Sequence, residues 1–150
     1  YPHIGSYGVA DEDVESRKVF AAGLVIKDLP IRASNFRSGK TLDAYLREQG
    51  TVAIAGLDTR RLTRVLRTTG AQNGCILALA AGEAVTQTHI DQALAAAKAA
   101  PSMAGLDLAK VVSRTEVQTW TQTEWKLGRG YGTQTAPKFH VVAYDFGVKH

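Results

Sequence analysis

Four arginines in the middle of the chain have the spacing of one helical surface. Arg60, Arg64 and Arg67 are separated by four and three residues, so a helix would place them on one face, with Arg61 beside them. Guanidinium groups pair with carboxylates and phosphates through planar, bidentate contacts. The row is therefore either a solvated basic face or a surface that meets an acidic partner, a phosphate or another subunit.

The remaining reactive side chains form no catalytic or metal-binding pattern. Cys75 opens an apolar run and lacks the glycine-flanked turn of a catalytic nucleophile, so we expect a buried, inert thiol. The four histidines have no metal-ligand spacing. The acidic run 11–15 lacks the spacing and the glycine of a calcium loop, which favours a solvated loop or a helix start. We expect no catalytic and no metal-binding residue here.

Three short glycine motifs resemble nucleotide sites without completing one. Gly39-Lys40-Thr41 lacks the earlier glycine of a phosphate loop, and no strand–helix unit surrounds the glycines of 128–132. Asp145-Phe146-Gly147 matches a kinase tripeptide whose companion motifs are missing. The sequence therefore predicts no cofactor-binding residue in this stretch.

Local signals place the arginine row on a helix. Asp58 and Thr59 can cap its first turn, and Gly70 can end it. An apolar stripe at helical spacing would face a core: Leu62, Val65 and Leu66. Asn73-Gly74 is then a turn pair that admits positive φ, and the run 75–80 predicts a buried strand.

Strands and helices alternate along the rest of the chain, which is typical of the α/β class. We expect helices over 41–49, 86–100 and 106–112, and strands over 19–27, 51–55, 117–125 and 139–144. Trp120 and Trp125 fall in one expected strand. They favour a packing seam, with a base-stacking platform as the alternative.

Composition sets wider limits. The chain has 150 residues, a net charge of +4 and a single cysteine, so it can form one ordinary core but no internal disulfide. It lacks a signal peptide and any apolar stretch long enough to span a membrane, so we expect a cytoplasmic protein without a membrane partner. Both ends look cut, which indicates a piece of a longer polypeptide.

Several blocks, in order, give the sequence a family resemblance. They are YPHIG at 1–5, DVES at 13–16, GLVI at 23–26, ASNFR at 33–37, IAGLDTRRLTR at 54–64, GAQNG at 70–74 and VVAYDFG at 141–147. Together they resemble the small, glutamine-hydrolysing chain of carbamoyl-phosphate synthase. The resemblance covers almost the whole chain and lies in that chain's N-terminal domain, not in its catalytic one.

The resemblance implies an α/β fold and a division into domains. Residues 1–126 would form most of a three-layer β/β/α swivelling domain, incomplete at its N-terminus. Residues 127–138 would be a linker, which their glycine-rich, polar composition also favours. Residues 139–150 would begin a class I glutaminase α/β domain with its first strand, and the glutaminase triad would lie beyond them.

The implied activity is joint. The small chain hydrolyses glutamine and passes ammonia to the large chain, which makes carbamoyl phosphate from bicarbonate with ATP and Mg²⁺; neither is expected to bind in this stretch. We expect this domain to dock the large chain through Arg60, Arg61 and Arg64 and to be inactive alone. The alternative is a small basic nucleic-acid-binding module that uses the arginines for phosphates and the tryptophans for stacking.

Overall fold

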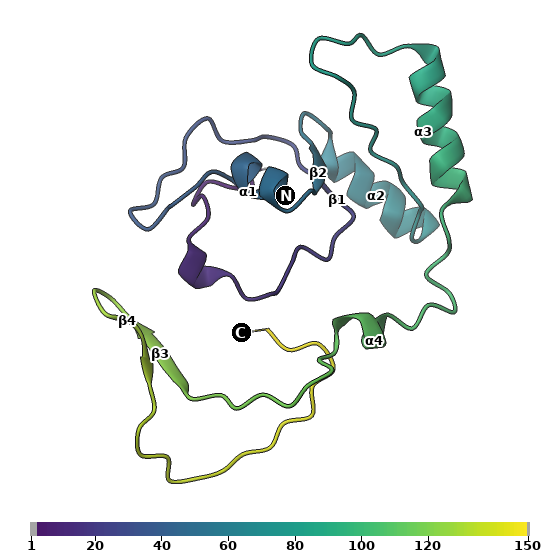
Figure 1. Cartoon of the computed structure of the whole chain (residues 1–150). Helices are drawn as coiled ribbons and strands as arrows, with labels where there is room; N and C mark the ends of the chain where they lie inside the picture. The colour runs from purple at the N-terminus through teal and green to yellow at the C-terminus, as the bar shows by residue number, and fades with distance from the viewer. Residues whose placement is uncertain (1–2, 150) are drawn as a thin grey trace. The chain divides into compact units, whose positions relative to one another are not determined.

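A computed structural model describes residues 3–149 and shows mixed α/β architecture (Figure 1). The chain divides into two compact units, Tyr1–Ala104 and Gly105–His150, called here unit 1 and unit 2. No helix among the described residues is long and apolar enough to cross a membrane. Each unit has one small sheet, so the α/β class is confirmed, whereas a three-layer swivelling domain stays a prediction.

Unit 1 is built on a β–α–β element. Strands β1 (Gly23–Val25) and β2 (Val52–Ile54) pair in parallel, and α1 (Leu42–Glu48) lies between them in sequence and contacts β2. The pairing continues past β1, since the Ile26 N–H donates to the Ile54 carbonyl at 3.0 Å. Parallel strands need such a crossover because the end of the first strand and the start of the second lie at opposite ends of the strand pair. The core sits here: Ile26 and Leu46 are the buried hydrophobic side chains of the described residues.

The N-terminal segment is fastened to the segment that precedes α1. Val9 forms an antiparallel bridge with Lys40, and the Ser34 N–H donates to the Ser6 carbonyl at 2.7 Å. Gly8 makes this approach possible. Its φ is +67°, and a Cβ built there would lie 2.0 Å from Ser38 Oγ and 2.8 Å from the Lys40 carbonyl oxygen. Only glycine fits this position without strain.

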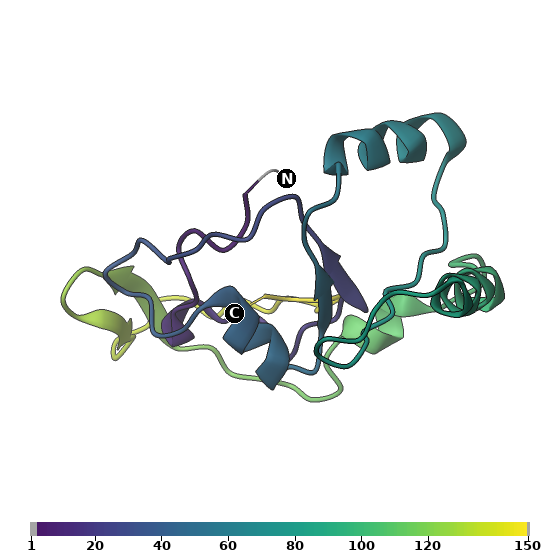
Figure 2. The same ribbon diagram turned by 90° about the horizontal axis from the view of Figure 1, so that it is seen from above.

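The second half of unit 1 consists of two helices and connecting loops. These are α2 (Thr59–Thr69) and α3 (Gln87–Ala99), whose residues match the expected ranges closely. Figure 2 shows α3 nearly end-on and α2 from the side, so the two helices are far from parallel. His89 has a structural role at the start of α3, where its Nδ1 accepts a hydrogen bond from the Thr86 N–H at 3.3 Å.

Unit 2 contains a short helix and a hairpin. Helix α4 (Leu108–Val112) is followed by strands β3 (Gln122–Lys126) and β4 (Gly130–Thr133), which pair antiparallel. Strand β4 lies inside 127–138, so part of the segment expected to be a linker is an ordered strand. Its glycines serve the hairpin turn, because Gly128 and Gly130 have φ of 75° and 70°.

Two expected strands are absent from the described residues. Segments 75–80 and 139–144 carry no strand, and the side chains of Phe139, Val141 and Tyr144 are 85–89% exposed. A strand exists only where a neighbour satisfies its backbone groups, and no neighbour pairs with either segment here. The first approaches β1 with one side chain, since Ile76 Cδ1 lies 2.9 Å from a Cβ built at Gly23.

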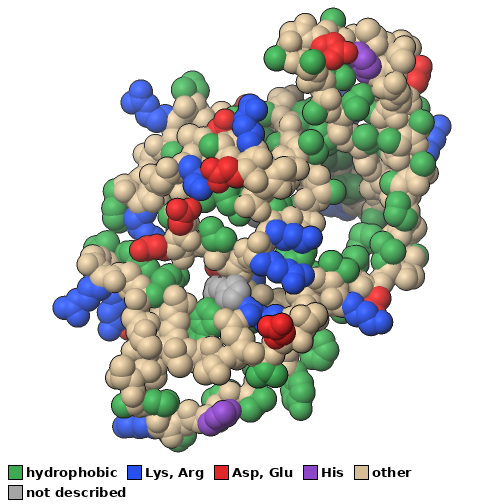
Figure 3. Space-filling model, in the orientation of Figure 1, with side chains coloured by type: hydrophobic (Ala, Val, Ile, Leu, Met, Phe, Trp, Pro, Cys, Tyr) green, Lys and Arg blue, Asp and Glu red, His purple; other side chains and the backbone are tan. Residues whose placement is uncertain are grey.

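Exposed apolar surface is the main consequence of this arrangement. Figure 3 shows hydrophobic side chains across the visible face, interspersed with Lys and Arg. The apolar stripe of α2 also contributes exposed surface, with Leu62, Val65 and Leu66 exposed by 41%, 44% and 39%. The stripe has the predicted helical spacing but is only partly covered.

Candidate functional site

The arginine helix begins and ends where its sequence predicts. The Asp58 carboxylate accepts from the Arg61 N–H at 2.9 Å, which satisfies one of the free donors of the first turn. At the other end, Gly70 adopts a φ of 83° and its N–H donates to the Leu66 carbonyl at 3.0 Å. These local contacts fix the extent of α2 and therefore the spacing of its arginines.

The helix separates its charged side from its apolar side. At 100° per residue, Arg60, Arg64 and Arg67 fall within about 60° of one another, and Arg61 lies at the margin of this face. The four side chains, which we call the arginine surface, are exposed. Among the described residues, no hydrogen bond or ion pair involves their guanidinium groups. They are therefore open to a partner from outside the chain.

Two other cations of unit 1, Arg37 and Lys40, are paired within the unit. Arg37 Nη2 lies 2.6 Å from Asp13 Oδ1 and 3.1 Å from Glu12 Oε2, and Lys40 Nζ lies 2.8 Å from Glu48 Oε2 and 3.5 Å from Asp11 Oδ1. Hydrogen bonding to Asp13 raises the pKa of Arg37, and hydrogen bonding to Glu48 raises that of Lys40.

This network explains the acidic run at 11–15. Its first three residues form the 3₁₀ turn η1 (Asp11–Asp13), whose carboxylates hold the segment that carries Arg37 and Lys40. Within residues 3–149, no group of three potential ligands could bind a metal ion. Asp11, Glu12 and Asp13 act as structural partners of Arg37 and Lys40.

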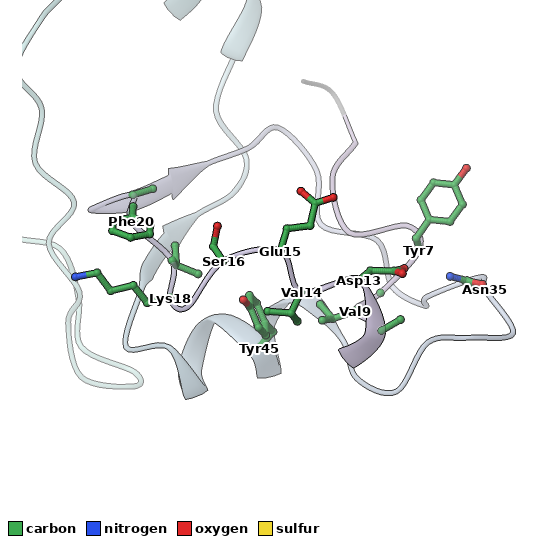
Figure 4. Close-up of a pocket in the computed structure, with 14 residues that line it drawn as sticks. Tyr7, Val9, Asp13, Val14, Glu15, Ser16, Lys18, Phe20, Asn35 and Tyr45 are labelled. Carbon is green, nitrogen blue, oxygen red and sulfur yellow. The ribbon is translucent and has the colours of Figure 1, made fainter. Parts of the chain in front are cut away.

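A pocket of ≈ 540 Å³ opens between the N-terminal segment and α1. Figure 4 shows Tyr45 of α1 near Val14 in the middle of its wall, with Tyr7 at one end and Phe20 at the other. Asp13 also lines the pocket, but it is already bonded to Arg37. The remaining wall is a mixture of aliphatic, aromatic and polar groups without a constellation that could carry catalysis.

The expected burial of Cys75 is wrong. The thiol is exposed because the segment 75–80 has no strand beside it to cover its side chains. No histidine contacts it among the described residues, so the structure gives it no general base. Exposure alone does not make it a nucleophile.

The arginines and the tryptophans belong to different units. The arginine surface lies in unit 1, whereas Trp120 and Trp125 lie in unit 2, Trp125 half-buried in β3 and Trp120 outside the strand. A nucleic-acid platform made of both sets is therefore not present within either unit. Within unit 1, the arginine surface has neither tryptophan beside it.

Three sets of structural contacts could not be read from the motifs of the sequence. Asp145 accepts from the N–H groups of Gly147 at 2.6 Å, Val148 at 2.5 Å and Arg114 at 3.1 Å, and the bond from Gly147 is the main cause of its lowered pKa. Asn73 Nδ2 donates to the Ala100 carbonyl at 2.8 Å. The Arg37 network is the third. An aspartate two residues before a glycine is a local signal for the Asp145 contacts. The Asn73 bond and the Arg37 network join residues far apart in sequence, so they have no local signal.

Comparison with known proteins places the chain in a family. Residues 1–76 match the family model described as the carbamoyl-phosphate synthase small chain, CPSase domain. A carbamoyl phosphate synthase small chain of Rubrivivax gelatinosus is 68% identical over 149 residues, and one of Ralstonia nicotianae is 61% identical over 150.

The matches cover 99% and 100% of this chain but 39% and 38% of those relatives. The chain thus spans about two-fifths of the length of the relatives it matches. More than half of its length fits the family model, and the similarity to the relatives extends from one end to the other. The chain belongs to the carbamoyl-phosphate synthase small-chain family.

Proposed function

We propose that this chain is part of the small subunit of a glutamine-dependent carbamoyl-phosphate synthase. The whole small subunit would hydrolyse glutamine and supply ammonia to a large chain, which would use ATP and Mg²⁺ to make carbamoyl phosphate from bicarbonate. The stretch of 150 residues would dock the large chain and support the glutaminase. It would hold no catalytic triad and no cofactor.

The proposal includes a division of labour along the sequence. Residues 1–126 would form the docking domain, and residues 127–138, which contain β4, would lead out of it. Residues 139–150 would enter the glutaminase domain. The exposed apolar side chains of 139–144 support this proposal, because a strand of that composition is stable only between neighbours.

The observation that carries the docking role is the contrast between two sets of cations. Arg37 and Lys40 are bonded to carboxylates of their own unit, whereas the arginine surface has no intramolecular partner among the described residues. Arg60 and Arg61 also lie in the first turn of α2, where positive charge opposes the helix dipole at a cost of a few tenths of a kcal/mol. A surface kept at that cost fits an acidic protein partner that pairs with guanidinium groups.

Charge reversal tests the proposal. The double variant R60E/R64E should bind a purified carbamoyl-phosphate synthase large chain at least about tenfold more weakly than the unaltered chain, because two attractive contacts become repulsive. The affinity can be measured by analytical ultracentrifugation at two salt concentrations. Circular dichroism should first show that each sample is folded.

A matched control separates local contacts from net charge. Arg32 and Lys98 are exposed and lie outside α2, and R32E/K98E changes the net charge by the same amount. We expect this control to lose much less affinity. Equal binding by R60E/R64E and the unaltered chain would refute the assignment of the arginine surface. A folded, unaltered chain that does not bind the large chain would refute the docking role itself.

A further inference from the structure

Packing by itself does not hold the arginine helix in one direction. The three apolar side chains that face inward from α2 are each about 40% exposed, so much of that stripe touches no other residue of the unit. A helix is normally oriented by the burial of such a stripe. The direction of α2 must therefore depend on how its two ends are attached.

The first end is attached through the loop that follows β2. The Gly56 N–H donates to the Lys27 carbonyl at 2.7 Å, which ties this loop to the segment after β1. Asp58 then caps the first turn of α2 two residues later. The start of the helix is thereby fixed to the sheet of unit 1.

The second end is attached to α3 by a side-chain hydrogen bond. Asn73 follows α2 by four residues, and its Nδ2 donates to the carbonyl of Ala100, the residue that ends α3, at 2.8 Å. The two residues are separated by 27 positions. The bond therefore joins the ends of two helices that are far from parallel (Figure 2).

The side-chain amide of Asn73, and not its backbone conformation, explains why an asparagine suits this position. The sequence predicts a turn at Asn73-Gly74 that admits positive φ, but neither residue has a positive φ in the structure. That prediction is wrong: the structure has no turn at these residues, and the Asn73 side chain is used for a distant contact. An amide can donate to a carbonyl, whereas an aspartate in its place cannot.

Gln72 supports the same loop. Its Nε2 lies within 3.3 Å of the carbonyl oxygens of Thr69 and Gly70 and 3.1 Å from that of Ala71. The side chain thus folds back onto the end of α2, where carbonyl groups lack helical partners. This keeps the loop close to the helix and leaves Asn73 directed at α3.

We propose that Asn73 is a positioning residue for the arginine surface, which through its bond to Ala100 sets the direction in which α2 presents Arg60 and Arg64 to an acidic surface of the large chain. This inference rests on the proposed docking function. Without the bond, α2 keeps its cap and its length but samples several directions, and only a fraction of them matches the partner. The apparent affinity is then the intrinsic affinity multiplied by that fraction.

Two variants of similar size isolate the hydrogen bond. In N73Q the side chain can still donate an N–H, whereas in N73M a side chain of comparable length has no donor. Neither variant has to adopt an unusual backbone conformation, since Asn73 has no positive φ. We expect N73M to bind the large chain roughly 2- to 10-fold more weakly and N73Q to bind nearly as well as the unaltered chain.

A double-mutant cycle shows whether Asn73 acts through the arginines. N73M is measured alone and in the R60E/R64E background, where the directed contacts have already been lost. We expect N73M to have little further effect on affinity in that background, although any effect on the urea midpoint should be the same in both. A residue that only stabilises the fold would lower affinity equally in both backgrounds.

The outcomes separate this inference from the proposed function. If R60E/R64E weakens binding and N73M does not, the docking role stands and the positioning role of Asn73 is overturned. Equal losses in the two backgrounds would overturn it as well. Unaltered binding by R60E/R64E would instead remove the docking surface itself. Should N73M lose helical structure by circular dichroism, N73A in the same cycle provides the variant without a donor.

Discussion

Replacing Gly8 with alanine should destabilise unit 1 by roughly 2–4 kcal/mol. An L-residue at its φ of +67° costs about 1–2 kcal/mol. The new Cβ would lie 2.0 Å from Ser38 Oγ, so that hydroxyl must rotate away and give up its 3.2 Å hydrogen bond to the Lys40 carbonyl, at about 0.5–1.5 kcal/mol. The Lys40 carbonyl oxygen, at 2.8 Å, belongs to the backbone and cannot rotate away.

Two other glycines provide matched controls. Gly50 has a φ of +62° and no atom within 4 Å of a built Cβ, so G50A should lose only the conformational part of the energy, about 1–2 kcal/mol. Gly74 has neither a positive φ nor a close neighbour, so G74A should be neutral or slightly stabilising. The difference between G8A and G50A measures the crowding against the segment before α1.

Urea unfolding followed by far-ultraviolet circular dichroism is a suitable assay. Helices α1, α2 and α3 belong to unit 1 and only the short α4 belongs to unit 2, so the signal reports mainly on unit 1. With a slope of about 1–3 kcal/mol/M, the G8A midpoint should fall by about 1 M or more. Because S38A already lacks the hydrogen bond to the Lys40 carbonyl, G8A should cost less in the S38A background than in the unaltered chain. A G8A midpoint no lower than that of G50A would refute the reasoning.

Two further predictions concern single carboxylates. D58A removes the side-chain acceptor at the start of α2 and should cost about 1 kcal/mol, measured as a lower urea midpoint by circular dichroism, whereas D58N should lose little. Asp145 has a pKa lowered from 3.8, mainly by the Gly147 N–H, so its stabilising effect is present above 3.8 and is lost as the pH falls through the lowered value. Fluorescence of Trp120 and Trp125, both in unit 2, should therefore show acid unfolding below 3.8 that is weaker in D145N; identical pH profiles would contradict this.

Helix α2 could be predicted from the sequence because its determinants are local. An aspartate before the first turn, a glycine after the last and apolar residues at helical spacing all lie within the segment itself. The observed helix, Thr59–Thr69, begins and ends at the expected residues. The arginine row could be placed on one face for the same reason.

The strands were predicted less well because they depend on distant neighbours. Segment 75–80 has the composition of a buried strand, yet no strand pairs with it, and Cys75 is exposed as a result. Strand β1 is limited to Gly23–Val25, the stretch that β2 accompanies. Pairing partners are not encoded in the local pattern of a strand.

The candidate site shows the same difference between local features, which could be predicted, and long-range contacts, which could not. The sequence identified the exposed arginines, but it gave the wrong reason for Asn73, since its partner lies 27 residues away. The ion pairs of Arg37 with Glu12 and Asp13 likewise join residues 25 and 24 positions apart. Such contacts become visible only once the chain is folded.

The small core of this chain has a thermodynamic consequence. Heat-capacity changes follow the apolar surface that enters or leaves water, and Ile26 and Leu46 are the only buried hydrophobic side chains among residues 3–149. The heat-capacity increment of unfolding should therefore be small for a chain of 150 residues. Any association that covers the exposed apolar side chains should in turn have a large negative heat-capacity change. Much of the calorimetric signature expected of a domain this size would then appear on assembly and not on folding.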